Sequence, residues 1–101
     1  MADASQNYVN RLYAIDDTKW WPVFAPVQCN FFAMQPNAPI LMRTDPDNQY
    51  SEKPIAAGVQ EYTTAPWPDP TSYGYRFPAG STMFYVRSAS GPAMVQISFV
   101  T

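Results

Sequence analysis

The sequence predicts a small all-β protein: an antiparallel β-sandwich or barrel with an extended or partly helical N-terminal arm. Two observations point to this class. Eleven prolines are spread along the chain, and from residue 22 onward they leave room for a long helix only at 79–91, where the residues alternate as in a strand. Short alternating runs also recur about every eight to twelve residues, separated by turn-forming residues. At 101 residues, the chain is long enough for one domain with its own core.

The first 22 residues differ from the remainder because they contain neither proline nor glycine before Pro22. Asp3 and Gln6 could form a weak capping box at the start of a short helix, but the residues that follow also alternate as in an extended segment. We expect residues 1–22 to form an arm that leaves the sandwich and becomes ordered against a neighbour. Residues 23–101 then form the β-sandwich domain.

Beyond the arm, alternating runs predict strands at residues 27–34, 40–43, 59–64, 82–87 and 93–100. Turn residues punctuate them at 45–48 and 78–81, and the proline-rich segment 65–75 is expected to be a long loop. Residues 88–92, Ser-Ala-Ser-Gly-Pro, predict a hairpin between the last two strands. We expect the last strand to be central in its sheet, with Ala93, Val95, Ile97 and Phe99 facing the core.

The residue types needed for catalysis are scarce. Histidine is absent, so the commonest general base and metal ligand is missing. Cys29 is the only cysteine, and in its strand-like run we expect a small buried hydrophobic residue. Asp45, Asp47 and Glu52 lack the spacing of an EF-hand calcium loop, and no acidic pair is spaced for glycoside hydrolysis. The sequence therefore predicts a protein that is not an enzyme and has no cofactor or metal.

Charge limits the partners. Only 14% of the residues are charged, against about 25% in typical soluble proteins, and the net charge is −2. The low charge indicates that part of the surface meets another protein, while the absence of a basic stretch argues against nucleic acid. No apolar stretch reaches the roughly 18 residues of a membrane span, and residues 1–12 lack signal-peptide features. We expect synthesis in a reducing cytosol.

Aromatic and apolar residues near the arm and in the proline-rich loop are the candidates for contact with a partner. Aromatic side chains are enriched at interface hot spots. Adjacent tryptophans cannot both point inward on a strand, so one of Trp20 and Trp21 should cover the core and the other face a partner. As an alternative, the tryptophans with Tyr73 and Tyr75 could stack on a sugar. The candidate interface residues are Tyr8, Leu12, Tyr13, Trp20, Trp21, Trp67, Tyr73 and Tyr75.

Residues 23–101 resemble small virion proteins of tailed phages, and capsid decoration (cement) proteins most of all. The resemblance rests on low charge, many prolines, the absence of histidine, an N-terminal arm and the ending PAGSTMFYVRSASGPAMVQISFV. It implies dimers or trimers on the capsid surface that bind the junctions between hexamers of the major capsid protein and reinforce the shell. It supplies no catalytic residues.

We therefore expect a non-enzymatic phage structural protein, made in the host cytoplasm and carried on the capsid surface of the virion. Its partners would be the major capsid protein or another virion protein, together with further copies of itself. Two alternatives remain open: a head–tail neck, tail or fibre component, and a carbohydrate-binding β-sandwich for host attachment.

Overall fold

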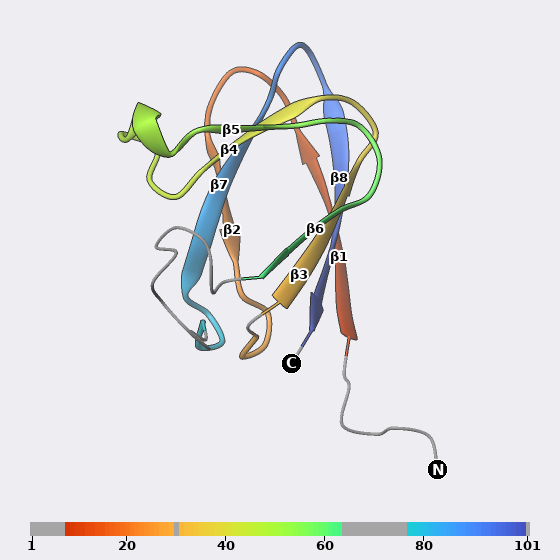
Figure 1. Ribbon diagram of the computed structural model, residues 1–101, viewed down its shortest axis with the longest axis vertical. Helices are drawn as coiled ribbons and strands as arrows, with labels where there is room; N and C mark the ends of the chain where they lie inside the picture. Colours follow the sequence, from red (N-terminus) through yellow and green to blue (C-terminus); the bar gives the residue numbers. More distant parts are fainter. Residues whose placement is uncertain (1–7, 30, 64–76, 101) are drawn as a thin grey trace.

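The computed structural model describes residues 8–29, 31–63 and 77–100, which form two antiparallel sheets packed face to face (Figure 1). The predicted all-β sandwich is confirmed. Within these residues the only helix is the short 3-10 turn η1, and none is long and apolar enough to cross a membrane. The elements in chain order are β1 (Tyr8–Ile15), β2 (Trp21–Phe24), β3 (Phe31–Pro36), β4 (Ile40–Arg43), η1 (Gln49–Ser51), β5 (Lys53–Ile55), β6 (Gln60–Thr63), β7 (Thr82–Ser88) and β8 (Ala93–Val100).

The strand order of the two sheets is β1-β8-β3-β6 and β2-β7-β4-β5. The first strand thus pairs with the last, the second with the seventh, the third with the sixth and the fourth with the fifth. A long antiparallel ribbon wound into two sheets gives this order, which is the topology of a jelly roll. Most connections consequently cross from one sheet to the other.

The last strand, β8, is central in its sheet, as the sequence predicts. It pairs with β1 over its whole length and with β3 on its other side. Every second side chain of β8 is buried, and its outward neighbours are exposed or half-buried. The predicted core-facing residues are confirmed: Ala93, Val95, Ile97 and Phe99 are at most 3% exposed.

The predicted hairpin at residues 88–92 is wrong, because β7 and β8 lie in different sheets. The connection crosses the top of the sandwich in Figure 1 and is bonded to neighbouring loops. The Ser88 N–H donates to the Asp16 carbonyl at 3.1 Å, and the Ala89 N–H donates to the Pro39 carbonyl at 3.1 Å. Alternation identifies a strand but not its partner, so the two runs alone could not distinguish a hairpin from a crossing.

The described part of the predicted arm also requires correction, because residues 8–24 contribute a strand to each sheet. β1 pairs antiparallel with β8 from Tyr8–Val100 to Ile15–Ala93. β2 pairs with β7, so the domain boundary does not fall after residue 22. The absence of proline and glycine marked a regular element here, and Ile15 buries its side chain in the core as a strand residue. Residues 1–7 lie outside the described residues.

Some of the other predicted strands are confirmed and others are not. The strands at 40–43 and around 60–63 are confirmed as β4 and β6, whereas β5 was not predicted. The run at 27–34 is interrupted: Cys29 forms an isolated bridge with Phe77, and β3 begins only at Phe31. This interruption lets Cys29 and Phe32 both be buried although alternation puts them on opposite faces. The predicted loop 65–75 lies outside the described residues.

The core fills the space between the sheets with apolar side chains from both. Phe32 of β3 and Phe84 of β7 stack across it, with ring centroids 4.8 Å apart and planes inclined by 30°. Cys29 is buried as expected, with its Sγ 3.8 Å from the Met83 Sδ. Burial raises the pKa of the Cys29 thiol from 9.0 to about 11, so at neutral pH it is an apolar filler.

Candidate interaction surfaces

Residues 44–52, here called the Tyr50 loop, join β4 to β5 and project from the sandwich at the left of Figure 1. Short polar side chains hold the backbone. The Asp45 carboxylate accepts the Asp47 N–H at 2.9 Å, and the Asn48 side chain accepts the Tyr50 N–H at 3.0 Å. The Asn48 N–H donates to the Asp45 carbonyl at 3.0 Å, which confirms the predicted turn at 45–48.

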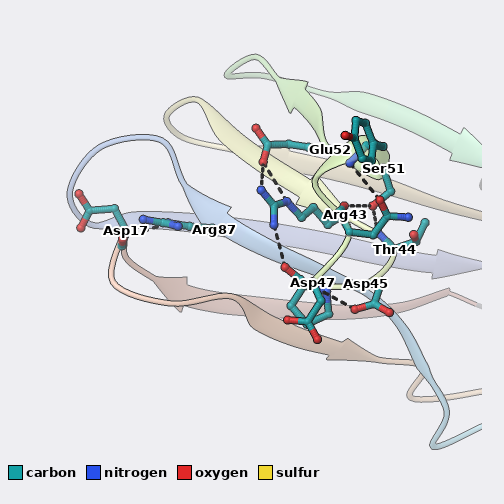
Figure 2. A network of polar contacts seen from close by, with 11 residues as sticks. Asp17, Arg43, Thr44, Asp45, Asp47, Ser51, Glu52 and Arg87 are labelled. Atoms are coloured by element: carbon teal, nitrogen blue, oxygen red, sulfur yellow. Dashed lines mark hydrogen bonds and ion pairs between the residues drawn. The ribbon is translucent and has the colours of Figure 1, made fainter.

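Arg43 braces the base of this loop (Figure 2). Its Nε and Nη2 donate to one Glu52 carboxylate oxygen at 2.9 and 2.6 Å, and its Nη1 donates to the Pro46 carbonyl at 2.7 Å. The Ser51 hydroxyl adds a second tie by accepting the Thr44 N–H at 3.2 Å. The Arg43 side chain is only 18% exposed, so these charge-assisted bonds are stronger than those of an open surface pair. The two ends of the loop are thereby fixed to each other.

The braced loop presents Tyr50, the most exposed of the large apolar side chains described, at 91%. Asp45 and Glu52, considered above as calcium ligands, instead form the internal contacts of the loop. An ordered loop loses little further entropy when its tip enters an interface, and tyrosine supplies a large rigid contact area. The Tyr50 loop therefore holds one aromatic ring in solvent on a fixed backbone.

Trp20, Arg43 and Arg87 form a tryptophan–arginine cluster on the outer face of the β2-β7-β4-β5 sheet. The Arg43 Cζ lies 4.5 Å from the centroid of the Trp20 ring, and the Arg87 Cζ lies 5.9 Å from it. Arg87 is also held by the Asp17 carbonyl, which accepts its Nε–H at 3.0 Å (Figure 2). These cation–π contacts fix the indole and cover part of its ring.

Trp21 takes the opposite role and packs partly buried against the core. Lys19 Nζ lies over its ring, 4.0 Å from the centroid. In the turn before β2, hydrogen bonds from the Thr18 hydroxyl at 2.6 Å and backbone N–H at 2.9 Å lower the pKa of the Asp16 carboxyl. The Trp21 indole N–H also lowers the Asp16 pKa slightly, although the Trp21 Nε1 is buried and its geometry to Asp16 falls short of a hydrogen bond.

The outer face of the other sheet has a different chemistry. Across β1, β8 and β3 none of its described outward side chains carries a charge, and Leu12 and Met94 are 65% and 38% exposed. The Ser98 hydroxyl donates to the Asn10 side chain at 2.6 Å, so even this polar pair is satisfied internally. We call this surface the neutral face. Its members are Asn10, Leu12, Ala14, Ala33, Gln35, Met94, Gln96, Ser98 and Val100.

The sequence-predicted interface residues do not gather at one place. Leu12 lies on the neutral face and Trp20 on the outer face of the opposite sheet. Tyr13 is half-buried on the core-facing row of β1, and burial raises the pKa of its hydroxyl while nearby Arg11 lowers it. The backbone of Tyr8 pairs with Val100. Trp67, Tyr73 and Tyr75 lie outside the described residues.

Sequence reasoning missed Met94, Tyr50 and the two arginines of the cluster. Met94 could have been found, because it alternates with core residues in a strand whose faces were predicted correctly. Tyr50 stands between turn residues, where an aromatic side chain cannot reach a core, and that position is a usable signal. The contacts of Arg43 and Arg87 depend on sheet order, which the local pattern does not encode.

Comparisons with protein-family models, with curated proteins and with solved structures found no match to this chain. The geometry of the described residues is therefore what supports a function. That geometry offers two surfaces for contact: the neutral face, and the aromatic surface formed by the Tyr50 loop and the tryptophan–arginine cluster.

Proposed function

We propose that this protein is a non-enzymatic structural protein of a phage virion, a capsid decoration protein that binds the major capsid protein and stabilises the shell. The observation that carries the proposal is the neutral face, where nine outward side chains on three strands carry no charge. A free surface of a small soluble domain usually has about 25–35% charged residues. A surface without charge over three of the four strands of its sheet, with Leu12 and Met94 exposed, favours burial against another protein.

The jelly-roll strand order supports the same class by analogy. Viral capsid proteins and lectins both use this topology, although a fold by itself does not fix a function. A sandwich of two paired sheets is a rigid body, and a rigid body binds without the cost of ordering a chain. Burial contributes about 25 cal/mol per Å² of apolar surface, and the gain is repeated at every copy on a shell.

The test is binding to empty shells of the phage that encodes the protein. Met94→Glu places a charge on the neutral face near the start of β8, at an exposed position where the core is untouched. We expect it to weaken shell binding at least about tenfold, because the charge must be desolvated at the interface. Ala57→Glu, in the exposed turn between β5 and β6, adds the same charge elsewhere and serves as the control.

If Met94→Glu binds shells as tightly as the native protein does, the neutral face is not the contact. An absence of shell binding altogether would contradict the decoration function. Imaging of whole virions would then distinguish a neck, tail or fibre component, because the protein would lie away from the capsid surface.

A second candidate function, carbohydrate binding for host attachment, is favoured by one observation. Tyr50 presents a nearly fully exposed ring on a braced loop of a jelly roll, and aromatic rings of this kind can stack on sugars. A glycan array probed with the isolated domain tests it. Binding that Tyr50→Ala abolishes would support this function, and an array with no bound glycan would remove it.

A further inference from the structure

The edges of the two sheets differ in how they are protected from pairing with another chain. Among the described strands, β2 ends one sheet and contains Pro22 and a register shift between Val23 and Phe24. β5 ends the same sheet, is three residues long and carries Lys53 and Pro54. The short β6 ends the other sheet. Proline, lysine, irregular register and short length are the usual means by which an exposed edge is blocked.

β1 is the remaining edge, and its one protective feature is a charged residue, Arg11, on its core-facing row. It is eight residues long, contains no proline, and keeps an unbroken register with β8 from end to end. Within the described residues β8 is the only strand that pairs with it. Leu12, in the middle of this edge strand, is 65% exposed. A long regular edge beside an exposed leucine is a template for a further strand.

We propose that β1 pairs antiparallel with β1 of a second copy of this chain, which joins two four-stranded sheets into one. Such a contact is isologous, so a twofold axis closes it at two copies instead of extending it into a fibre. The axis runs perpendicular to the joined sheet, and both neutral faces therefore lie on the same side. The dimer presents one continuous uncharged surface of twice the size.

Charge selects the register of this pairing. Side chains alternate between the two faces of β1, and residues directly opposite each other in the pair point to the same face. The two neutral faces are therefore continuous only if one residue lies opposite its own counterpart at the twofold axis. Centring on Arg11 or on Leu12 gives the longest overlap, over residues 8–14 or 9–15. Centring on Arg11 would place two guanidinium groups opposite each other, which is unfavourable. Centring on Leu12 places each Arg11 opposite Tyr13 of the other copy and the two leucines together.

Arg11 does not block this arrangement. Its one described bond is a solvent-exposed contact, 3.2 Å from Nη1 to the carbonyl of its neighbour Asn10. Replacing a long, solvent-exposed hydrogen bond with a bond to another partner costs little free energy. Ala14, which falls opposite Asn10, is small enough to leave the edge accessible.

The first measurement is the mass of the full chain in solution by light scattering. We expect twice the 11.4 kDa of one chain. Leu12→Glu puts two like charges together at the axis and should shift the protein to the mass of a single chain, while circular dichroism shows the fold intact because the position is exposed. Met94→Glu changes the same neutral face on the central strand and should remain dimeric.

The second measurement fixes the register by cross-linking. Leu12→Cys brings two thiols within disulfide reach across the axis, and mild oxidation should give a covalent dimer on a non-reducing gel. Ala14→Cys lies opposite Asn10 in the other copy and should not cross-link. The native Cys29 is buried with a raised pKa, so it gives no background.

A native chain that keeps the mass of one copy at the highest soluble concentration overturns the proposal. So does a dimer that survives Leu12→Glu and is not cross-linked by Leu12→Cys, because another surface would then join the copies. The inference goes beyond the proposed function: a dimer in solution needs no shell, and shell binding by a monomer would leave the decoration function standing.

Discussion

At the scale of single residues, the thiol of Cys29 links burial to pH dependence. Its pKa is about 11 in the folded protein and near its ordinary 9.0 when unfolded. When folding raises the pKa of a group, the contribution of that group to stability is complete below its pKa in the unfolded chain. The contribution is lost as the pH rises through its pKa in the folded protein. The unfolded chain releases the proton first, and stability should therefore fall between pH 9 and pH 11, by about 2–3 kcal/mol.

Denaturant melts of the native protein and of Cys29→Ala over this range check the expectation. The variant starts less stable because it leaves a gap beside Met83, but its stability should fall less steeply with pH. Tyr13, whose pKa is also raised by burial, is present in both proteins and cancels in the comparison. Parallel curves for the two proteins would contradict the assignment.

Neighbouring residues of β8 should respond very differently to substitution. Phe99 is fully buried, and Phe99→Ser removes its ring and leaves a hydroxyl in the core, at a cost of about 3–5 kcal/mol or more. Ser98 is on the neutral face, and Ser98→Ala loses only its exposed bond to Asn10, worth about 1 kcal/mol or less. Thermal melts of both variants measure the difference. A larger loss for Ser98→Ala would invert the assignment of the two faces.

At the scale of elements, the Tyr50 loop should depend on a single brace. Arg43→Gln removes the bonds to Glu52 and Pro46, and we expect a loss of about 1–2 kcal/mol. Hydrogen exchange at the amides of Asn48 and Tyr50 should accelerate more than exchange in the strands, because the loop opens locally. Arg87→Gln touches the same tryptophan but not the loop and is the control. Unchanged exchange in Arg43→Gln would show that the turn bonds alone hold the loop.

The first strand should be indispensable to the domain. Deleting residues 1–15 removes the whole of β1, exposes one side of β8 and takes Ile15 from the core. We expect the shortened chain to lose its β-sheet circular dichroism or to aggregate through the freed edge. Retention of a native melting transition would mean that β1 is an accessory strand, closer to the arm that the sequence predicted.

Prediction from the sequence succeeded where the physical cause is local. Alternation along β8 identified its core face, and prolines and turn residues identified the all-β class and the turns at 45–48 and 78–81. It failed where the structure depends on which strands, distant in the chain, pair with each other. The pairing of β1 with β8, and the placement of β7 and β8 in separate sheets, depend on contacts between residues up to 92 positions apart. The tryptophan–arginine cluster follows from those pairings and was hidden with them.

At the scale of the whole molecule, the jelly-roll order makes nearly every strand pairing long-range. The edge strands β1 and β2 form their sheet hydrogen bonds only after they pair with β8 and β7, respectively. Closing such large loops costs entropy before any contact offsets it, so we expect folding in the millisecond-to-second range typical of all-β sandwiches. Stopped-flow refolding followed by tryptophan fluorescence measures the rate. A microsecond phase that recovers the native signal would contradict this expectation.

The central position of β8 also bears on how the chain is made. Synthesis proceeds from the amino end, so β1 and β3 emerge from the ribosome long before the strand that must lie between them. Until residues 93–100 have left the exit tunnel, the first sheet has no middle, and its apolar strands face water or other nascent chains. Folding of this sheet therefore waits until residues 93–100 are available, and until then its exposed apolar strands are prone to aggregation.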